Sequence, residues 1–150
     1  MAILSLQARA YVHATENRDK VVKAILEVFP ETLRGSLRSE TEVYEGYYGN
    51  PIEVLTVEIE DPKGALETLK YILGRLSETD RMRLSETLED RVDKQGGLYM
   101  RLSKQNAFKG SLVLEEGDDV IRVHVRFSGG KREALKYYKE LLAEYGARTS

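Results

Sequence analysis

Residues 4–14 read LSLQARAYVHA, and this stretch decides the fold because its side chains alternate strictly along the chain. A period of two residues is typical of a half-buried β-strand, which turns one face to a core and the other to solvent. We therefore predict a strand here. Its inner face carries Leu4, Leu6, Ala8, Ala10, Val12 and Ala14, and its outer face carries Ser5, Gln7, Arg9, Tyr11 and His13.

After this strand, the spacing of apolar residues divides the rest of the chain into predicted helices and strands. Thr15 or Asn17 can cap the first helix, and Asp61 followed by Pro62 can start the second. Residues 31–39 are irregular, and residues 104–110 form a polar interruption too short for a full helix. The predicted elements are a helix over 21–29, a hairpin of strands 40–48 and 52–60, a helix after Asp61 to residue 76, a charged surface helix over 80–92 packed through Met82, Leu84, Leu88 and Val92, strands 98–103, 111–114 and 120–128, and a last helix closed by Gly146.

This order of elements predicts an α+β fold, because helices alternate with strand pairs and hairpins. We expect a two-layer sandwich in which one mixed, antiparallel-rich sheet has helices packed on one face. A chain of 150 residues is long enough for one good core, so we expect a single domain over residues 1–150. A hinge between subdomains would fall at Gly96 and Gly97.

Charge is nearly balanced over the whole chain but not along it. The 23 basic and 25 acidic residues, with a pI near 5.8, exclude a uniformly basic nucleic-acid coat protein. Residues 40–69 hold eight acids and one base, a balance of −7, whereas residues 91–132 hold nine bases and five acids, a balance of +4. Any contact with RNA or DNA must therefore use a local patch.

The polar faces of three predicted strands carry arginine, histidine and tyrosine together. If these strands are neighbours, the open sheet face offers guanidinium groups that pair with phosphate and rings that stack on unpaired bases. A solvated outer face and a surface for a second copy of the chain explain the same pattern. The residues expected to contact RNA are Arg9, Arg101, Lys104, Lys109, Arg122, His124 and Arg126.

A second candidate, an anion site, is formed by Gly129, Gly130, Lys131 and Arg132, which place free amides and two cations at the start of the last helix. It is not a Walker loop, because Val125 stands where the first glycine is needed and Arg132 replaces Ser or Thr. A plain strand-to-helix turn is the competing interpretation.

Other chemistries have no support in the sequence. The absence of cysteine removes disulfides, thiol nucleophiles and cysteine-based metal sites, and it suits a reducing cytoplasm, where we expect the protein to act. His13 and His124 lie on polar strand faces without carboxylate partners, so we expect no metal site. The acidic residues around Gly117 lack EF-hand spacing and are interpreted as a solvated turn. We expect no cofactor, no catalytic residue and no membrane segment.

Four segments also match the motifs of a known family. They are AYVHATE at 10–16, GYYGNPI at 46–52, LYMRL at 98–102 with Lys104, Gln105, Ala107 and Gly110 after it, and DVIRV at 119–123. Over most of its length the chain resembles an archaeal RNA-binding, exosome-subunit-like family, with a fold similar to the ribosomal protein that binds five-S RNA. The resemblance implies an α+β fold, no enzyme activity, RNA as the ligand and an association with RNA-processing machinery.

The family motifs fall mainly on turns. They map onto Tyr48, Gly49, Asn50 and Pro51 in the hairpin and onto Lys104, Gln105 and Gly110 after the strand. Glycine, asparagine and proline serve a tight turn equally well, so a motif match alone does not assign an RNA contact. The loop at Gly129 and Gly130 is shorter than in many relatives, which weakens the case for an anion site there.

The leading hypothesis is a small, non-enzymatic, cytoplasmic protein that binds RNA through one face of its sheet. The alternative is a structural or adaptor protein that uses its open sheet for a homodimer or for components of an RNA-processing complex. A nuclease would need carboxylates clustered near the basic face. The position of the first, fourth and last strands in the sheet decides whether the basic residues form one patch.

Overall fold

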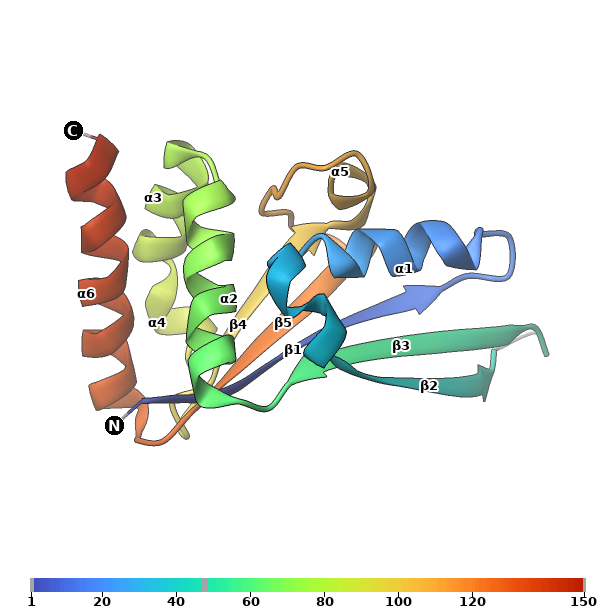
Figure 1. The fold of residues 1–150 in the computed structure, drawn as a ribbon, viewed down its shortest axis with the longest axis horizontal. Coiled ribbons are helices and arrows are strands. Elements are labelled where there is room, and N and C mark those ends of the chain that lie inside the picture. The colour runs from blue at the N-terminus through green and yellow to red at the C-terminus, as the bar shows by residue number, and fades with distance from the viewer. Residues whose placement is uncertain (1, 47–48, 150) are drawn as a thin grey trace.

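A five-stranded sheet forms one layer of the protein, and helices form the other (Figure 1). The computed structural model describes residues 2–46 and 49–149. The strands are β1 (Ile3–Val12), β2 (Arg38–Glu45), β3 (Pro51–Ile59), β4 (Leu98–Ser103) and β5 (Val120–Phe127). They lie in the order β2-β3-β1-β5-β4, and every neighbouring pair is antiparallel. The α+β sandwich expected from the sequence is confirmed.

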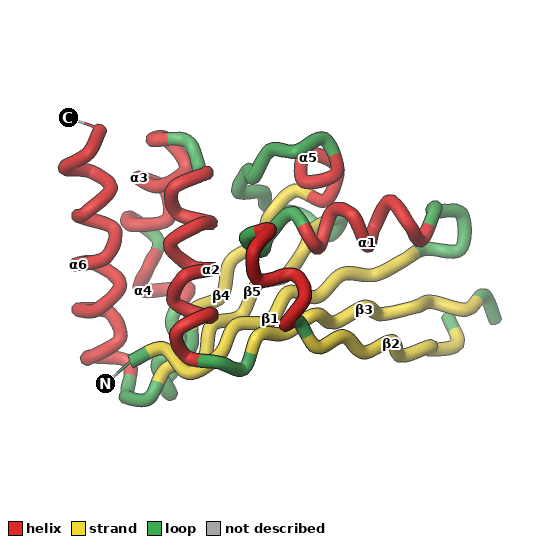
Figure 2. Tube along the Cα trace, viewed as in Figure 1, coloured by secondary structure: helices red, strands yellow, loops and turns green. Residues whose placement is uncertain are grey.

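The helices lie on one side of this sheet, in two groups (Figure 2). They are α1 (Arg18–Leu26), the 3₁₀ helix η1 (Glu31–Ser36), α2 (Pro62–Arg75), α3 (Glu78–Glu86), α4 (Leu88–Arg91), α5 (Lys104–Phe108) and α6 (Lys131–Thr149). Figure 1 shows α2, α3, α4 and α6 together at one end of the sheet and α1 with α5 toward the other. The opposite face of the sheet carries no helix among the described residues.

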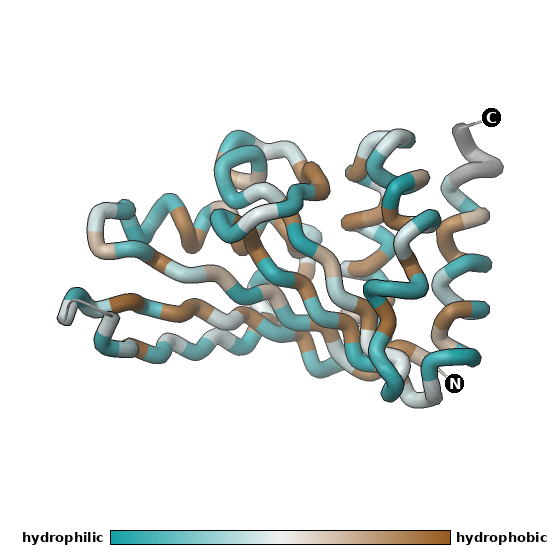
Figure 3. The backbone as a smooth tube through the Cα atoms, turned by 180° about the vertical axis from the view of Figure 1, so that it is seen from behind, coloured by the Kyte–Doolittle hydropathy of each residue, from teal (hydrophilic) through white to brown (hydrophobic). Residues whose placement is uncertain are grey.

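From Leu6 to Val12 the central strand β1 has the alternation that its sequence predicts, but the strand ends at Val12, and Ala14, expected on the inner face, is exposed. Leu6, Ala8 and Ala10 are fully buried, whereas Arg9 and Tyr11 are half-buried on the other face. The small alanine side chains let α1 and α2 pack directly over the strand. An irregularity in the register before residue 5 changes the alternation at the start of β1. Figure 3, seen from behind, shows the alternation of hydrophobic and hydrophilic residues along the strands.

Helix caps predicted from the sequence are also present. The side chain of Asn17 accepts a hydrogen bond from the backbone N–H of Asp19 and caps α1. The side chain of Asp61 accepts one from Gly64, and Pro62 stands in the first position of α2. The predicted hairpin of β2 and β3 is confirmed by their antiparallel pairing, although Tyr48 lies outside the described residues.

One predicted strand, residues 111–114, is wrong. Only Leu114 forms an isolated bridge, to Leu102 of β4. Two backbone hydrogen bonds flank this bridge, from the Ser103 N–H to the Val113 oxygen and from the Glu115 N–H to the Arg101 oxygen, so the pairing with β4 is limited to this one turn of chain. The N–H of Leu114 points away from β4 and donates to the buried carboxylate of Asp80 on α3 at 3.0 Å. Alternation of apolar residues over so short a segment does not distinguish a strand from a buried loop.

Helix boundaries differ from the prediction at five places. Helix α1 begins at Arg18 and ends at Leu26, three residues before the expected end at Phe29. The irregular stretch contains η1, and residues 104–108 form the short helix α5 because the Ser103 side chain accepts a hydrogen bond from the Asn106 N–H. The stretch 80–92 begins earlier, at the Ser77 cap, and divides at Thr87 into α3 and α4. Met82 is 56% exposed and does not pack inward. Gly146 does not end α6, which continues to Thr149.

Candidate nucleic-acid interface

Arginines from three neighbouring strands stand directly opposite one another on the open face of the sheet. Arg9 of β1 pairs in register with Arg122 of β5, and Arg122 pairs with Arg101 of β4. Residues opposite each other in an antiparallel sheet project from the same face with Cβ atoms about 5 Å apart. The first, fourth and last strands are therefore adjacent, and their basic residues form one patch, which we call the arginine row (Arg9, Arg122 and Arg101).

Within residues 2–46 and 49–149, the arginine row lacks a carboxylate at ion-pair distance. Among the described residues, none of its members forms an ion pair within 4 Å, and the Nε of Arg9 is buried without a hydrogen-bond partner. Arg122 instead lies over the ring of Tyr11, with 5.5 Å from its guanidinium carbon to the ring centroid, and Arg101 donates to a backbone oxygen at 3.4 Å. Like charges directly opposite one another destabilise a sheet, so the row favours a bound anion.

An aromatic pair lies next to the arginine row. The rings of Tyr99 and His124 stack with centroids 4.2 Å apart and an angle of 18° between their planes. Tyr99 is 48% exposed and covers His124, whose Nε2 is buried without a hydrogen-bond partner. Burial lowers the pKa of His124, against a smaller opposite effect of Asp93. At neutral pH the pair is thus an uncharged platform, and burial also raises the pKa of the Tyr99 phenol.

The backbone at residue 97 passes so close to His124 and Asp93 that only glycine fits there. A Cβ on Gly97 would lie 2.6 Å from His124 Nε2 and 2.9 Å from a carboxylate oxygen of Asp93. The other oxygen of Asp93 accepts hydrogen bonds from the backbone N–H groups of Gln95 and Gly97. The turn before β4 is therefore shaped around the histidine. The predicted hinge at Gly96 and Gly97 coincides with this packed turn.

Arg126 extends the basic surface along β5. It is exposed and stands opposite Ser5 of β1, two residues beyond His124 on the same face. The open face thus brings together five of the seven residues expected to contact RNA: Arg9, Arg101, Arg122, His124 and Arg126.

Lys104 and Lys109 do not join this group. The Lys104 side chain is 3% exposed, and its Nζ lies 2.9 Å from carboxylate oxygens of Glu16 and Asp119 and 2.9 Å from the backbone oxygen of Tyr11. Lys104 thus connects the end of β1 to α5 and to the loop before β5. Its ammonium, followed by the amide of Gln105, lowers the pKa of Asp119. Lys109 is exposed at the C-terminal end of α5. Contacts of these two lysines with RNA stay predictions.

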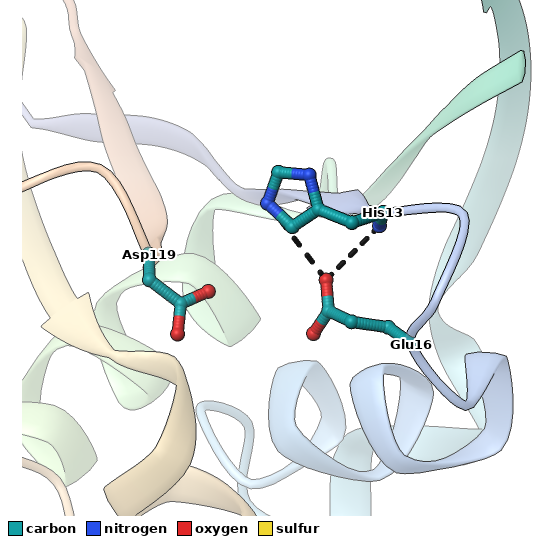
Figure 4. Close-up of side chains that lie close together, drawn as sticks. All are labelled: His13, Glu16 and Asp119. Atoms are coloured by element: carbon teal, nitrogen blue, oxygen red, sulfur yellow. Dashed lines mark hydrogen bonds and ion pairs between the residues drawn. The ribbon is translucent and has the colours of Figure 1, made fainter. Parts of the chain in front are cut away.

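The same cluster resembles a metal site in its donor spacing. His13, Glu16 and Asp119 place ligand-type atoms within 4.8 Å of one another (Figure 4). The expectation that His13 lacks carboxylate partners is wrong: its ring lies 3.9 Å from Glu16, whose carboxylate also accepts a hydrogen bond from the His13 backbone. However, the Lys104 ammonium already contacts both carboxylates and supplies the positive charge that a cation would bring. The donor set therefore fits a lysine-centred salt bridge better than a metal ion.

The turn at Gly129, Gly130, Lys131 and Arg132 is separate from the arginine row. Gly130 accepts the first helical hydrogen bond of α6 from Ala134, and the Glu133 carboxylate lies beside it. Lys131 lies 3.6 Å from Glu89 of α4. An acidic side chain in the first turn already complements the helix dipole. Anion binding here stays a prediction.

The family motifs noted in the sequence have local structural roles in the described residues. Gly49 and Gly110 adopt positive φ angles of 78° and 94°, which favour glycine, and the oxygen of Asn50 accepts a hydrogen bond from Gly46. The alternation also places Tyr11 and Tyr99 on the open face. Only the strand register shows that they contact Arg122 and His124.

Fold and site together define an α+β protein with a basic, aromatic sheet face. A protein family described as RNA binding matches residues 5–127. The chain is 36% identical over 142 residues, 92% of each chain, to the RNA-binding protein PAB1135 of Pyrococcus abyssi. The chain belongs to this archaeal RNA-binding family.

Solved structures show the same fold in archaeal relatives. Protein AF2318 from Archaeglobus fulgidus superposes with a TM-score of 0.80 and 33% identity, covering 93% of this chain and 99% of that one. Mth689 from Methanothermobacter thermautotrophicus gives a TM-score of 0.77 with 28% identity, covering 95% and 99%. In the part of the chain that the structure describes, no helix has the length and apolar character needed to cross a bilayer.

Proposed function

We propose that this protein binds RNA, without catalysing a reaction, through the open face of β1, β5 and β4. The observation that carries the proposal is the uncompensated arginine row on adjacent strands. Membership of an RNA-binding family supports RNA as the anion.

Each part of the face has a chemical role in this proposal. The guanidinium groups of Arg9, Arg101 and Arg122 pair with phosphates, which relieves their mutual repulsion. The exposed ring of Tyr99, backed by neutral His124, offers a surface on which an unpaired base stacks. Arg126 adds a further phosphate contact at the edge of the patch.

The finer features implied by the family resemblance belong to the same proposal. They are an association with RNA-processing machinery such as the exosome, a kinship of fold with the ribosomal protein that binds five-S RNA, and action in the cytoplasm. A homodimer or adaptor contact through the same face is the alternative.

The test is binding of a fluorescein-labelled RNA hairpin with a single-stranded tail, followed by anisotropy over a range of salt concentrations. We expect the double variant Arg101→Ala/Arg122→Ala to bind at least about tenfold more weakly than wild type. Its salt slope should fall by about 1.4, because roughly 0.7 is lost for each single-strand phosphate contact.

A matched control removes the same charge from the helical side. Lys63 and Lys70 are exposed on α2, so Lys63→Ala/Lys70→Ala should leave the affinity within about twofold of wild type. Equal losses in the two double variants would reject the arginine row as the interface. Failure of the wild type to bind this RNA at low salt would reject the function.

A further inference from the structure

The edge strand β2 is open to a partner along its whole length. All eight of its residues are exposed, and among the described residues it pairs only with β3. An edge strand presents a row of unpaired backbone N–H and C=O groups to any extended chain that approaches it. This strand also lies in the acidic part of the sequence, which the RNA interface does not use.

The two faces of β2 differ in chemistry. Glu40 and Glu42 project on the open face, because their register partners Thr56 and Val54 pair with Arg9 and Tyr11 of β1. Val43 alternates with them, projects on the side of the helices and is 65% exposed. On this open face Glu40 lies 3.3 Å from Arg38 of the same strand, and Glu42 accepts a hydrogen bond from the Tyr44 hydroxyl. A segment that pairs with β2 would therefore meet these two exposed carboxylates, with their neutral or basic neighbours, on one face and Val43 on the other.

A groove of mixed lining lies next to the second of these faces. It has a volume of about 300 Å³ and lies between α1 and the β2–β3 pair, with Leu26, Leu37 and Leu55 among its apolar lining and Arg18, Arg34 and Glu40 among its charged lining. Arg18 of α1 contacts Thr41 and Glu53 beside it. Apolar side chains of an added strand would thus lie along Val43 and this groove.

We propose that the β2 edge takes up an extended, basic segment of a protein partner as a sixth strand of the sheet. Lysine or arginine at alternate positions pairs with Glu40 and Glu42, and apolar residues between them cover Val43. RNA is not the occupant, because the carboxylates repel phosphate. The assignment uses the acidic half of the molecule and does not depend on RNA binding at the arginine row.

A second copy of the chain fits this edge poorly. In a two-fold antiparallel pairing of β2 with itself, residues of the same face stand opposite each other. The two registers with the longest overlap, centred on residues 41 and 42, place Glu40 opposite Glu42 or Glu42 opposite Glu42. The shorter register centred on residue 40 places Glu40 opposite Glu40, although it also brings Arg38 opposite Glu42. Like charges directly opposite are unfavourable, so charge complementarity selects a basic partner.

The experiment uses a labelled heptapeptide, Thr-Lys-Val-Lys-Val-Lys-Thr, titrated with the full-length protein and followed by anisotropy. A second peptide, Thr-Lys-Pro-Lys-Pro-Lys-Thr, has the same charge, but its two prolines prevent it from pairing as a strand. We expect the first peptide to bind at least tenfold more tightly than the second. Hydrogen exchange should slow at β2 amides in the complex.

The variant Glu40→Lys/Glu42→Lys should weaken this binding at least tenfold. Glu115→Lys/Asp118→Lys, an equal charge change in the exposed loop before β5, should leave it within about twofold. Glu40→Gln/Glu42→Gln gives an intermediate loss and replaces the first variant if that one does not fold. Equal binding of the two peptides, or no binding at millimolar protein, overturns the proposal. Concentration-dependent dimerisation through β2 overturns the choice of occupant.

Discussion

The arginine row and the Lys104 cluster place the same positive charge in opposite surroundings. Arg9, Arg122 and Arg101 stand together on an open face and form no ion pair with any of the described residues, whereas Lys104 is buried between the carboxylates of Glu16 and Asp119. The first arrangement leaves charge unsatisfied and suits an external anion. The second satisfies the charge internally and holds three loops together. Basic residues that look alike in the sequence thus divide into a group without ion pairs and a group paired inside the protein.

The largest effect is expected from Lys104→Met, which keeps the alkyl chain but removes the ammonium. Loss of one partner from a buried ion cluster should lower the free energy of unfolding at pH 7 by about 2–4 kcal/mol. RNA affinity should stay within about twofold of wild type at a temperature where both are folded. Denaturant unfolding and anisotropy measure the two quantities.

The same variant has a pH signature. The pKa of Asp119 is lowered in the folded state, so the contribution of its pairing with Lys104 is present above the unfolded pKa of about 4 and is lost as the pH falls through the folded value. The stability difference between wild type and Lys104→Met should therefore be smaller at pH 3 than at pH 7. If Lys104→Met instead kept its stability and lost RNA affinity, Lys104 would belong with the RNA-contacting residues and not with the structural ones.

A smaller effect of opposite sign is expected in the arginine row. Arg101→Thr removes a like charge opposite Arg122 and should raise the free energy of unfolding by up to about 0.5 kcal/mol at low salt, while RNA binding weakens. The gain should vanish as salt screens the repulsion. Lys63→Thr, on exposed α2, is the control and should not stabilise. A loss of stability in Arg101→Thr would show that the row is not strained by its own charge.

The smallest effect concerns the aromatic pair. Burial lowers the pKa of His124, so below its unfolded pKa of about 6.5 the unfolded chain takes up a proton more readily and the folded state loses stability. His124→Phe keeps the stack on Tyr99 without this titration. The thermal midpoint of wild type should fall more than that of His124→Phe between pH 7.5 and 5.5. Parallel changes in both proteins would mean that His124 is not buried as a neutral ring.

Much of this fold is readable from local patterns. Strict alternation in residues 4–14 and 98–103 predicts β1 and β4, and the Asp61 and Pro62 pair predicts the start of α2. The alternation in residues 111–114 is misleading, because the segment joins β4 only at Leu114 and is otherwise held by contacts such as the one from the Leu114 amide to Asp80 of α3, more than thirty residues earlier in the chain. A contact of that range leaves no periodic trace in the segment itself.

The sequence alone determines the alternating faces, the helix caps, the acidic and basic halves and the absence of cysteine chemistry, because these depend on residue type and short spacing. The tertiary structure alone decides that β1, β5 and β4 are neighbours, since strand order depends on pairing between distant segments. That order places Arg9, Arg122 and Arg101 in one row. It also places Lys104 beside Glu16 and Asp119, where the low dielectric of the interior requires its charge to be paired.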